Sequence, residues 1–131
     1  MDKNGLPVKM KITAGTVNDS IEAAYLIEGI DFQKLLADKA FDVDAIIEAV
    51  ISKGAEAVIP PKANRKIQRW YDKELYKKRH LVENVMMFLK RWRGIATRYA
   101  KNTIMFLGAV QICCFTLWLN RLKPKTRVNT L

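Results

Sequence analysis

Short apolar runs alternate with amphipathic segments through the first half of the chain, and this order restricts the fold most. Apolar runs or apolar–charged alternation predict strands at 8–12, 32–38 and 55–61. Helical periodicity predicts helices at 19–30 and 42–54. Alternating strands and helices are typical of an α/β domain, in which the strands pair in parallel through right-handed crossovers. We therefore expect an α/β fold.

Polar residues and glycines set the expected limits of these two helices. Asn18 or Asp19 is the expected N-cap of the first helix. Asp42 or Asp44 is the expected N-cap of the second, and Gly54 is its expected stop. Asp38 ends the strand at 32–38. Functional groups collect at the carboxyl ends of strands in open parallel sheets, so Asp38 is a candidate site residue.

The second half of the chain predicts helices rather than strands. A long helix is expected from about residue 72 to 93, stopping near Gly94. Residues 103–119 carry no charge, and 121–131 form a basic tail. A membrane span needs about 20 apolar residues. We expect residues 103–119 to form a helix packed against the sheet, with a single-pass membrane protein as the alternative.

The formal charge of +10 favours an anionic partner, either nucleic acid or an acidic membrane surface. The charge is concentrated in residues 62–101, which hold 13 Lys and Arg against 3 Asp and Glu. Cys113 and Cys114 are the only cysteines and His80 is the only histidine. This composition excludes a zinc site of the CxxC type and a multi-histidine metal site.

Four residues of the long helix combine one carboxylate with a phenol and two cations. At about 100° per residue, Tyr76, Arg79, Glu83 and Lys90 fall within about 60° of one another. A solvated face with an ion pair between Arg79 and Glu83 at i, i+4 is the simpler interpretation. That interpretation leaves Tyr76, Lys90 and the excess of basic groups unexplained.

The spacing Y-x2-R-x3-E-x6-K resembles the signature helix of bacterial insertion-sequence transposases of the DDE type. "LLADKAFD" is similar to the strand that carries the second catalytic aspartate of that family. "AVIPPKANRK" and "RWRGIATRYAKN" resemble the segments before and after the signature helix. "DKNGLPVK" resembles the stretch after the family's first strand, which places the first aspartate at Asp2.

The resemblance implies an RNase H-like catalytic domain over residues 1–120, with 121–131 as a basic flexible tail. We expect the domain to lack most of its first, central strand, and to carry the long signature helix and the C-terminal apolar helix. Asp2, Asp38 and Glu83 would be the catalytic and metal-binding carboxylates. They would hold two Mg²⁺ ions, for which Mn²⁺ is a substitute. The implied reaction is phosphodiester hydrolysis followed by strand transfer.

The resemblance also implies a set of DNA contacts. Tyr76, Arg79 and Lys90 would hold the phosphates around the scissile bond. Trp70 could stack on an unpaired base, although packing is the commoner role of such a residue. Further cations would extend the contacts to the DNA backbone without reading its sequence. These cations are Lys62, Arg65, Lys66, Arg69, Arg91, Arg93 and Arg98.

The expected partners are DNA, both as element ends and as target, and an upstream-encoded N-terminal half or a full-length transposase. We expect a homo-oligomer when active, a cytoplasmic, nucleoid-associated location in a bacterium, and no membrane partner. Three alternatives stay open. They are a catalytically inactive DNA-binding relic, a plain RNase H-like nuclease and a small single-pass membrane protein.

Overall fold

The computed structural model describes residues 1–13, 19–98 and 102–122. The chain divides into two compact units. The central unit is Thr13–His80, and the terminal unit joins Met1–Ile12 to Leu81–Leu131. Each unit has its own hydrophobic core.

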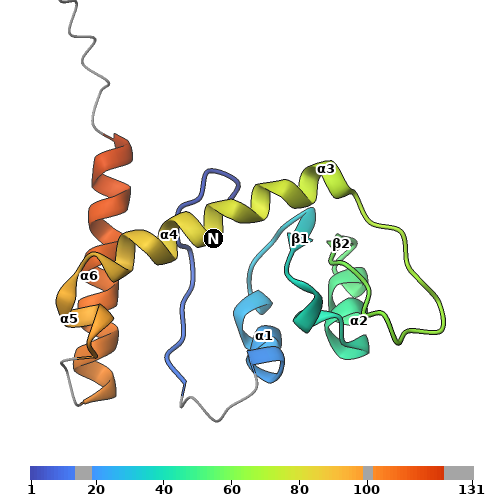
Figure 1. The fold of residues 1–131 in the computed structure, drawn as a ribbon, viewed down its shortest axis with the longest axis horizontal. Coiled ribbons are helices and arrows are strands. Elements are labelled where there is room, and N and C mark those ends of the chain that lie inside the picture. Colours follow the sequence, from blue (N-terminus) through green and yellow to red (C-terminus); the bar gives the residue numbers. More distant parts are fainter. Residues whose placement is uncertain (14–18, 99–101, 123–131) are drawn as a thin grey trace, which may run out of the picture. The chain divides into compact units, whose positions relative to one another are not determined.

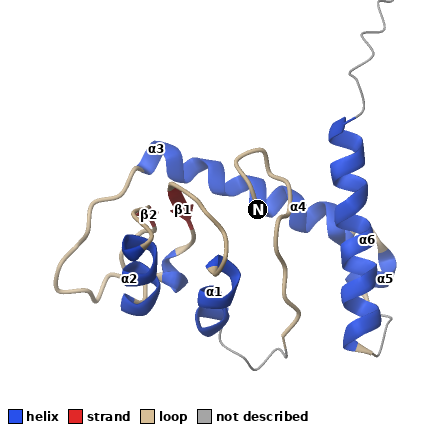
Figure 2. Ribbon diagram, turned by 180° about the vertical axis from the view of Figure 1, so that it is seen from behind, coloured by secondary structure: helices blue, strands red, loops and turns tan. Residues whose placement is uncertain are grey.

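The central unit contains a small parallel sheet. β1 (Lys34–Leu36) and β2 (Glu56–Val58) pair in parallel, with Lys34 opposite Glu56 and Leu36 opposite Val58. The Nζ of Lys34 lies 2.8 Å from Oε2 of Glu56, so the pair is joined by charge as well as by its backbone. Figure 2 shows the two strands in red. The expected parallel pairing of these two segments is confirmed.

Two helices accompany the strands of this unit, with a short 3₁₀ turn between β1 and the second helix. Apolar side chains from both helices pack together in the core, including Ile27, Ile46 and Val50, and Ile59 joins them from the segment after β2. The strand–helix–strand order around α2 is visible in Figure 1. The helical elements are α1 (Asp19–Ile27), η1 (Lys39–Phe41) and α2 (Asp44–Ser52).

The end of α2 follows the sequence prediction, but its start does not. Gly54 adopts a left-handed backbone with φ of 71°, and its N–H donates to the carbonyl of Ile51 at 2.8 Å. This geometry ends the helix as expected. The N-cap position is Val43, which makes no side-chain cap bond. The predicted cap by Asp42 or Asp44 is wrong. Asn18, a predicted cap of α1, lies outside the described residues.

The strand predicted at residues 8–12 is absent from the structure, where this described segment is irregular. Apolar–polar alternation gives a strand only where a neighbouring strand accepts its backbone hydrogen bonds. Within the described residues, the sheet consists of β1 and β2 alone. The segment that contains Pro7 contacts a helix of its own unit instead, because the indole Nε1 of Trp118 donates to the Pro7 carbonyl at 3.0 Å.

The terminal unit is built from helices. Its core joins Leu89 of α4 to Val110, Cys113 and Cys114 of α6. Partly buried side chains from the first segment and from α5, such as Met10 and Ile95, pack around them. Figure 1 labels the three helices, which are α4 (His80–Lys90), α5 (Arg93–Ala96) and α6 (Thr103–Leu122).

α6 is long and apolar, and most of its surface is exposed within its unit. It has 20 residues and a mean hydropathy of 1.6, and 17% of its most apolar window is buried. Ile104, Met105 and Ile112 are 79%, 71% and 63% exposed. By length and composition, α6 is the one helix among the described residues that qualifies as a possible membrane span. It also extends to Leu122, past the expected domain end at residue 120.

Candidate nucleic-acid interface and acidic positions

Asp2 organises a tight turn at the start of the terminal unit. Its Oδ1 accepts the backbone N–H of Asn4 at 2.9 Å and that of Leu6 at 2.8 Å. Its Oδ2 accepts the side-chain amide of Asn4 at 3.3 Å. Burial opposes the charged form, but these hydrogen bonds outweigh it and hold the pKa of Asp2 below its usual value. The carboxylate is therefore ionised and held in place by its own turn.

Asp38 lies two residues beyond the end of β1, as the sequence predicted for the carboxyl end of a strand. It is the N-cap of η1, and its Oδ1 accepts the backbone N–H of Ala40 at 2.7 Å. The residue is half-buried. Its orientation is thus fixed by a local cap bond rather than by a long-range contact.

Glu83 and Lys90 lie on α4, in the terminal unit, and both are exposed. Seven residues of α-helix separate them by about 20° around the axis, so they share one side of α4. Glu83 lies in the first turn and Lys90 in the last turn. Both charges therefore complement the helix dipole. This much of the predicted arrangement is present within one unit.

Tyr76 and Arg79 belong to the central unit and precede α4 in the chain. The long helix predicted at 72–93 is divided into α3 (Lys73–Tyr76), η2 (Lys77–Arg79) and α4. A 3₁₀ turn advances about 120° per residue rather than 100°, so helical-wheel angles counted across η2 do not hold. Tyr76 packs edge-on against Tyr71, with ring centroids 5.6 Å apart.

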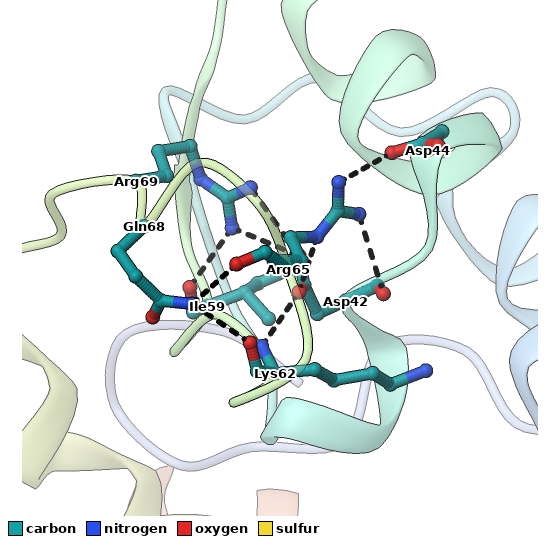
Figure 3. Close-up of polar contacts among 7 residues, drawn as sticks. All are labelled: Asp42, Asp44, Ile59, Lys62, Arg65, Gln68 and Arg69. Carbon is teal, nitrogen blue, oxygen red and sulfur yellow. Dashed lines mark hydrogen bonds and ion pairs between the residues drawn. The ribbon is translucent and has the colours of Figure 1, made fainter.

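The sequence interpretation missed a buried carboxylate, that of Asp42, which precedes α2. The basic segment after β2 folds around it. The side chain of Asp42 is fully buried, and its Oδ2 accepts the backbone N–H of Lys62 at 2.8 Å. The same oxygen accepts Nε of Arg65 at 2.6 Å, and Oδ1 lies 3.3 Å from both terminal nitrogens of Arg69. Figure 3 shows both guanidinium groups pointing toward Asp42.

The network around Asp42 extends to its neighbours. Nη1 of Arg65 donates to Oδ1 of the exposed Asp44 at 2.6 Å, and Nη2 of Arg69 donates to the carbonyl of Ile59 at 2.9 Å. Burial opposes ionisation of Asp42. The bonds from the Lys62 N–H and the Arg65 guanidinium outweigh this effect and hold the pKa of Asp42 below its usual value. The Asp42 and Asp44 carboxylates raise the pKa of Arg65.

The sequence did carry a signal for this cluster. "KAFDVDAII" places Asp42 between two apolar residues, ahead of a helix that buries its apolar face. A carboxylate in such a position is either a helix cap or the partner of a cation. The local pattern favoured the cap. The groups that bind Asp42 are one backbone N–H and two guanidinium groups, which lie 20, 23 and 27 residues further along the chain.

The other predicted DNA contacts are exposed. Arg91, Arg93 and Arg98 of the terminal unit have exposed side chains, and the guanidinium of Arg98 lies 5.7 Å from the ring centroid of Phe106. In the central unit, Lys66 is exposed and Trp70 is 78% exposed. The packing role favoured for Trp70 is therefore wrong within its unit.

Comparison with known proteins places these residues in a family. A family model described as the transposase DDE domain matches residues 1–118. The chain belongs to the transposase DDE domain family. Its members use divalent metal ions in general.

A curated relative from Brucella ovis agrees with this assignment. It is described as "Putative transposase for insertion sequence element IS6501" and is 35% identical over 122 residues, which cover 91% of this chain and 93% of the relative. No solved structure matches the chain. The family of this DDE transposase domain is thus shown by sequence, and the structure adds a helix-rich arrangement with a two-stranded parallel sheet.

The acidic residues of this DDE transposase domain have the right chemistry for a hard divalent cation, which prefers carboxylate oxygens. Asp2 and Glu83 belong to the terminal unit and Asp38 to the central unit. In the part of the chain that the structure describes, no three His, Cys, Asp or Glu side chains gather closely enough to hold a metal ion. The donor types of Asp2, Asp38 and Glu83 fit such an ion.

Proposed function

We propose that the chain is an insertion-sequence transposase that acts on DNA by metal-dependent phosphodiester hydrolysis and strand transfer. The match of the family model to residues 1–118 is the observation that carries this proposal. The name of the Brucella ovis relative and the formal charge of +10 support it. An RNase H-like fold and a cytoplasmic location in association with the nucleoid belong to the same proposal.

Asp2, Asp38 and Glu83 are the proposed metal-binding carboxylates. Bound Mg²⁺ would activate the attacking oxygen and stabilise the leaving oxygen of the phosphodiester. The chain supplies three carboxyl side chains for this purpose. Asp2 is fixed by two backbone N–H groups, Asp38 is fixed by the N–H of Ala40, and Glu83 is carried by the first turn of α4.

Tyr76, Arg79 and Lys90 are the proposed phosphate ligands. A guanidinium binds two phosphate oxygens at once, and an ammonium acts as a point charge. The half-buried Lys62 and the exposed cations Lys66, Arg91, Arg93 and Arg98 extend these contacts along the DNA backbone. Arg65 and Arg69 belong to the same basic region, and their guanidinium groups contact Asp42.

The test uses a plasmid that carries the DNA flanking both sides of the gene, together with the purified chain. We expect strand breaks at the flanks, and joined products, with MgCl₂ and not with EDTA. Binding of the flanking DNA without strand breaks, both with MgCl₂ and with EDTA, would favour the inactive DNA-binding relic. Breaks without joined products would favour a plain nuclease. Neither binding nor breaks would reject the proposal.

α6 favours one second candidate, a single-pass membrane protein. Its 20 residues are long enough to span a bilayer, and several of its largest apolar side chains are exposed. A membrane protein would stay in the membrane pellet through a high-salt wash and a following alkaline wash. A DNA-bound chain would leave the pellet in high salt. Release of the chain by salt alone would exclude the membrane candidate.

A further inference from the structure

Residues 62–69 form an irregular basic segment that is held together by its own hydrogen bonds. The N–H of Arg65 donates to the carbonyl of Lys62 at 3.0 Å. The side-chain amide of Gln68 donates to the carbonyls of Lys62 and Arg65, both at 3.0 Å. These bonds close the segment into a loop, here called the basic loop. Figure 3 shows how its residues surround Asp42.

Asp42 attaches the basic loop to the rest of the central unit at three points. The carboxylate accepts the backbone N–H of Lys62, the Nε of Arg65 and the terminal nitrogens of Arg69. These contacts reach the first, middle and last residues of the loop. Without them, an irregular segment of this length would sample many conformations in solution.

The charges of the loop divide into two groups. Asp42 and Asp44 balance Arg65 and Arg69, whose side chains are 26% and 27% exposed. A guanidinium that left Asp42 to bind a phosphate would remove one of the two cations that balance this fully buried carboxylate, which is unfavourable. The uncompensated positive charge of the loop is therefore that of its lysines. Lys66 is exposed, and the side chain of Lys62 extends away from the cluster in Figure 3.

We propose that Asp42 is a positioning residue that holds the basic loop in a preformed DNA-binding conformation. In this loop, Lys62 and Lys66 contact phosphates, and Arg65 and Arg69 bind Asp42. The proposal rests on the proposed function, because it assumes that the central unit binds DNA. A preformed loop binds more tightly because less conformational entropy is lost on association.

The first experiment compares two substitutions that change the charge equally. Asp42→Asn and Glu48→Gln each remove one negative charge from the central unit, and Glu48 is an exposed residue of α2. If only the net charge affected binding, both variants would bind DNA as tightly as the wild-type chain or more tightly. We expect Asp42→Asn to bind a fluorescein-labelled duplex of mixed sequence at least about threefold more weakly, which corresponds to a loop that is competent about one third of the time. Glu48→Gln should bind as tightly as the wild-type chain or more tightly.

The second experiment measures the salt dependence of binding, a quantity that a purely structural role does not change. Each phosphate contact contributes about 0.9 to the slope of log affinity against log salt concentration. Lys62→Gln and Lys66→Gln should each reduce the slope by about this amount. Arg65→Gln should weaken binding but keep the wild-type slope. A slope reduced as much in Arg65→Gln as in Lys66→Gln would overturn the division of roles.

Amide hydrogen exchange measures directly how firmly the basic loop is held in its conformation. The N–H of Lys62 should lose protection in Asp42→Asn by more than the amides of α2, which lose only what the lower free energy of unfolding takes away. Unchanged exchange at Lys62, or tight DNA binding by Asp42→Asn, would overturn the positioning role and leave the proposed function intact. If the wild-type chain bound no DNA, the proposed function would fail, and this inference would fail with it.

Discussion

The Nε of Arg65 lies 2.6 Å from Oδ2 of Asp42, whose side chain has no exposed surface. The two residues are 23 positions apart, with Asp42 between η1 and α2 and Arg65 in the basic loop after β2. A charge-assisted contact of this length in a buried setting ties together two segments that have no backbone pairing with each other. It also compensates the positive charge of Arg65, so that this charge is not available to an anionic partner.

Asp42→Ala should destabilise the chain far more than Asp44→Ala. Removal of the Asp42 carboxylate leaves the buried contacts of two arginines and one backbone N–H without an acceptor, which costs about 3–5 kcal/mol. Asp44 pairs with the same Arg65, but its side chain is 76% exposed. Loss of an exposed pair costs about 0–1 kcal/mol. Urea unfolding followed by circular dichroism measures both differences.

Asp44→Ala is the matched control for this comparison, because it removes a carboxylate of the same size and charge from the same arginine. Equal free energies of unfolding for the two variants would show that the Asp42 cluster makes no special contribution.

The contribution of Asp42 to stability should disappear in acid. Its pKa in the folded chain lies below the usual value of about 3.9. The stabilisation is therefore fully present above the unfolded pKa and is lost as the pH falls through the folded pKa. We expect the difference in unfolding free energy between wild type and Asp42→Asn to be largest near about pH 6 and to shrink toward about pH 2. A difference that stayed constant over this range would contradict the assignment.

Glu83→Gln should abolish metal-dependent DNA cutting while DNA binding stays intact or becomes stronger. The amide cannot replace a carboxylate as a metal ligand, and loss of a negative charge reduces repulsion of phosphate. We expect the rate of cutting to fall at least about 100-fold. Glu74→Gln is the control, because Glu74 is exposed and pairs with Lys77 at 2.8 Å. Cutting by Glu83→Gln at the rate of the control would reject the role of Glu83.

Cys113 and Cys114 should react slowly with thiol reagents in the native chain. Burial raises the pKa of both thiols, and Cys114 is affected further by the neighbouring Cys113. Their side chains lie in the core of the terminal unit, at 2% and 5% exposure. Because the thiolate is the reactive form, modification near pH 8 should be at least about tenfold slower than in urea. Equal rates with and without urea would show that this core is open.

Local patterns predicted the elements of the central unit that depend on neighbours in sequence. Gly54 ends α2 because its backbone reaches the left-handed region without steric cost. The apolar runs of β1 and β2 pair in parallel because a helix connects them. The same pattern failed at residues 8–12, where alternation alone cannot supply a partner strand.

In the candidate site too, some features follow from local sequence and others depend on the tertiary structure. The spacing of Glu83 and Lys90 was sufficient to place them on one side of α4, because a regular helix fixes angles between residues. The angles to Tyr76 and Arg79 could not be fixed in this way, because η2 changes the pitch between them. Nothing local distinguished Arg65 and Arg69 from Lys62 and Lys66 as ligands for phosphate.

The sequence by itself determined the family, the excess of positive charge after β2 and the end of α2 at Gly54, since each depends on residue identity and short-range spacing. Only the tertiary structure decided which of those positive charges are compensated internally. Asp42 is ionised and fully buried because residues 20 to 27 positions away surround it with donors. Such an arrangement depends on how distant segments pack, and the large cost of an unpaired buried charge then fixes which arginines stay with it.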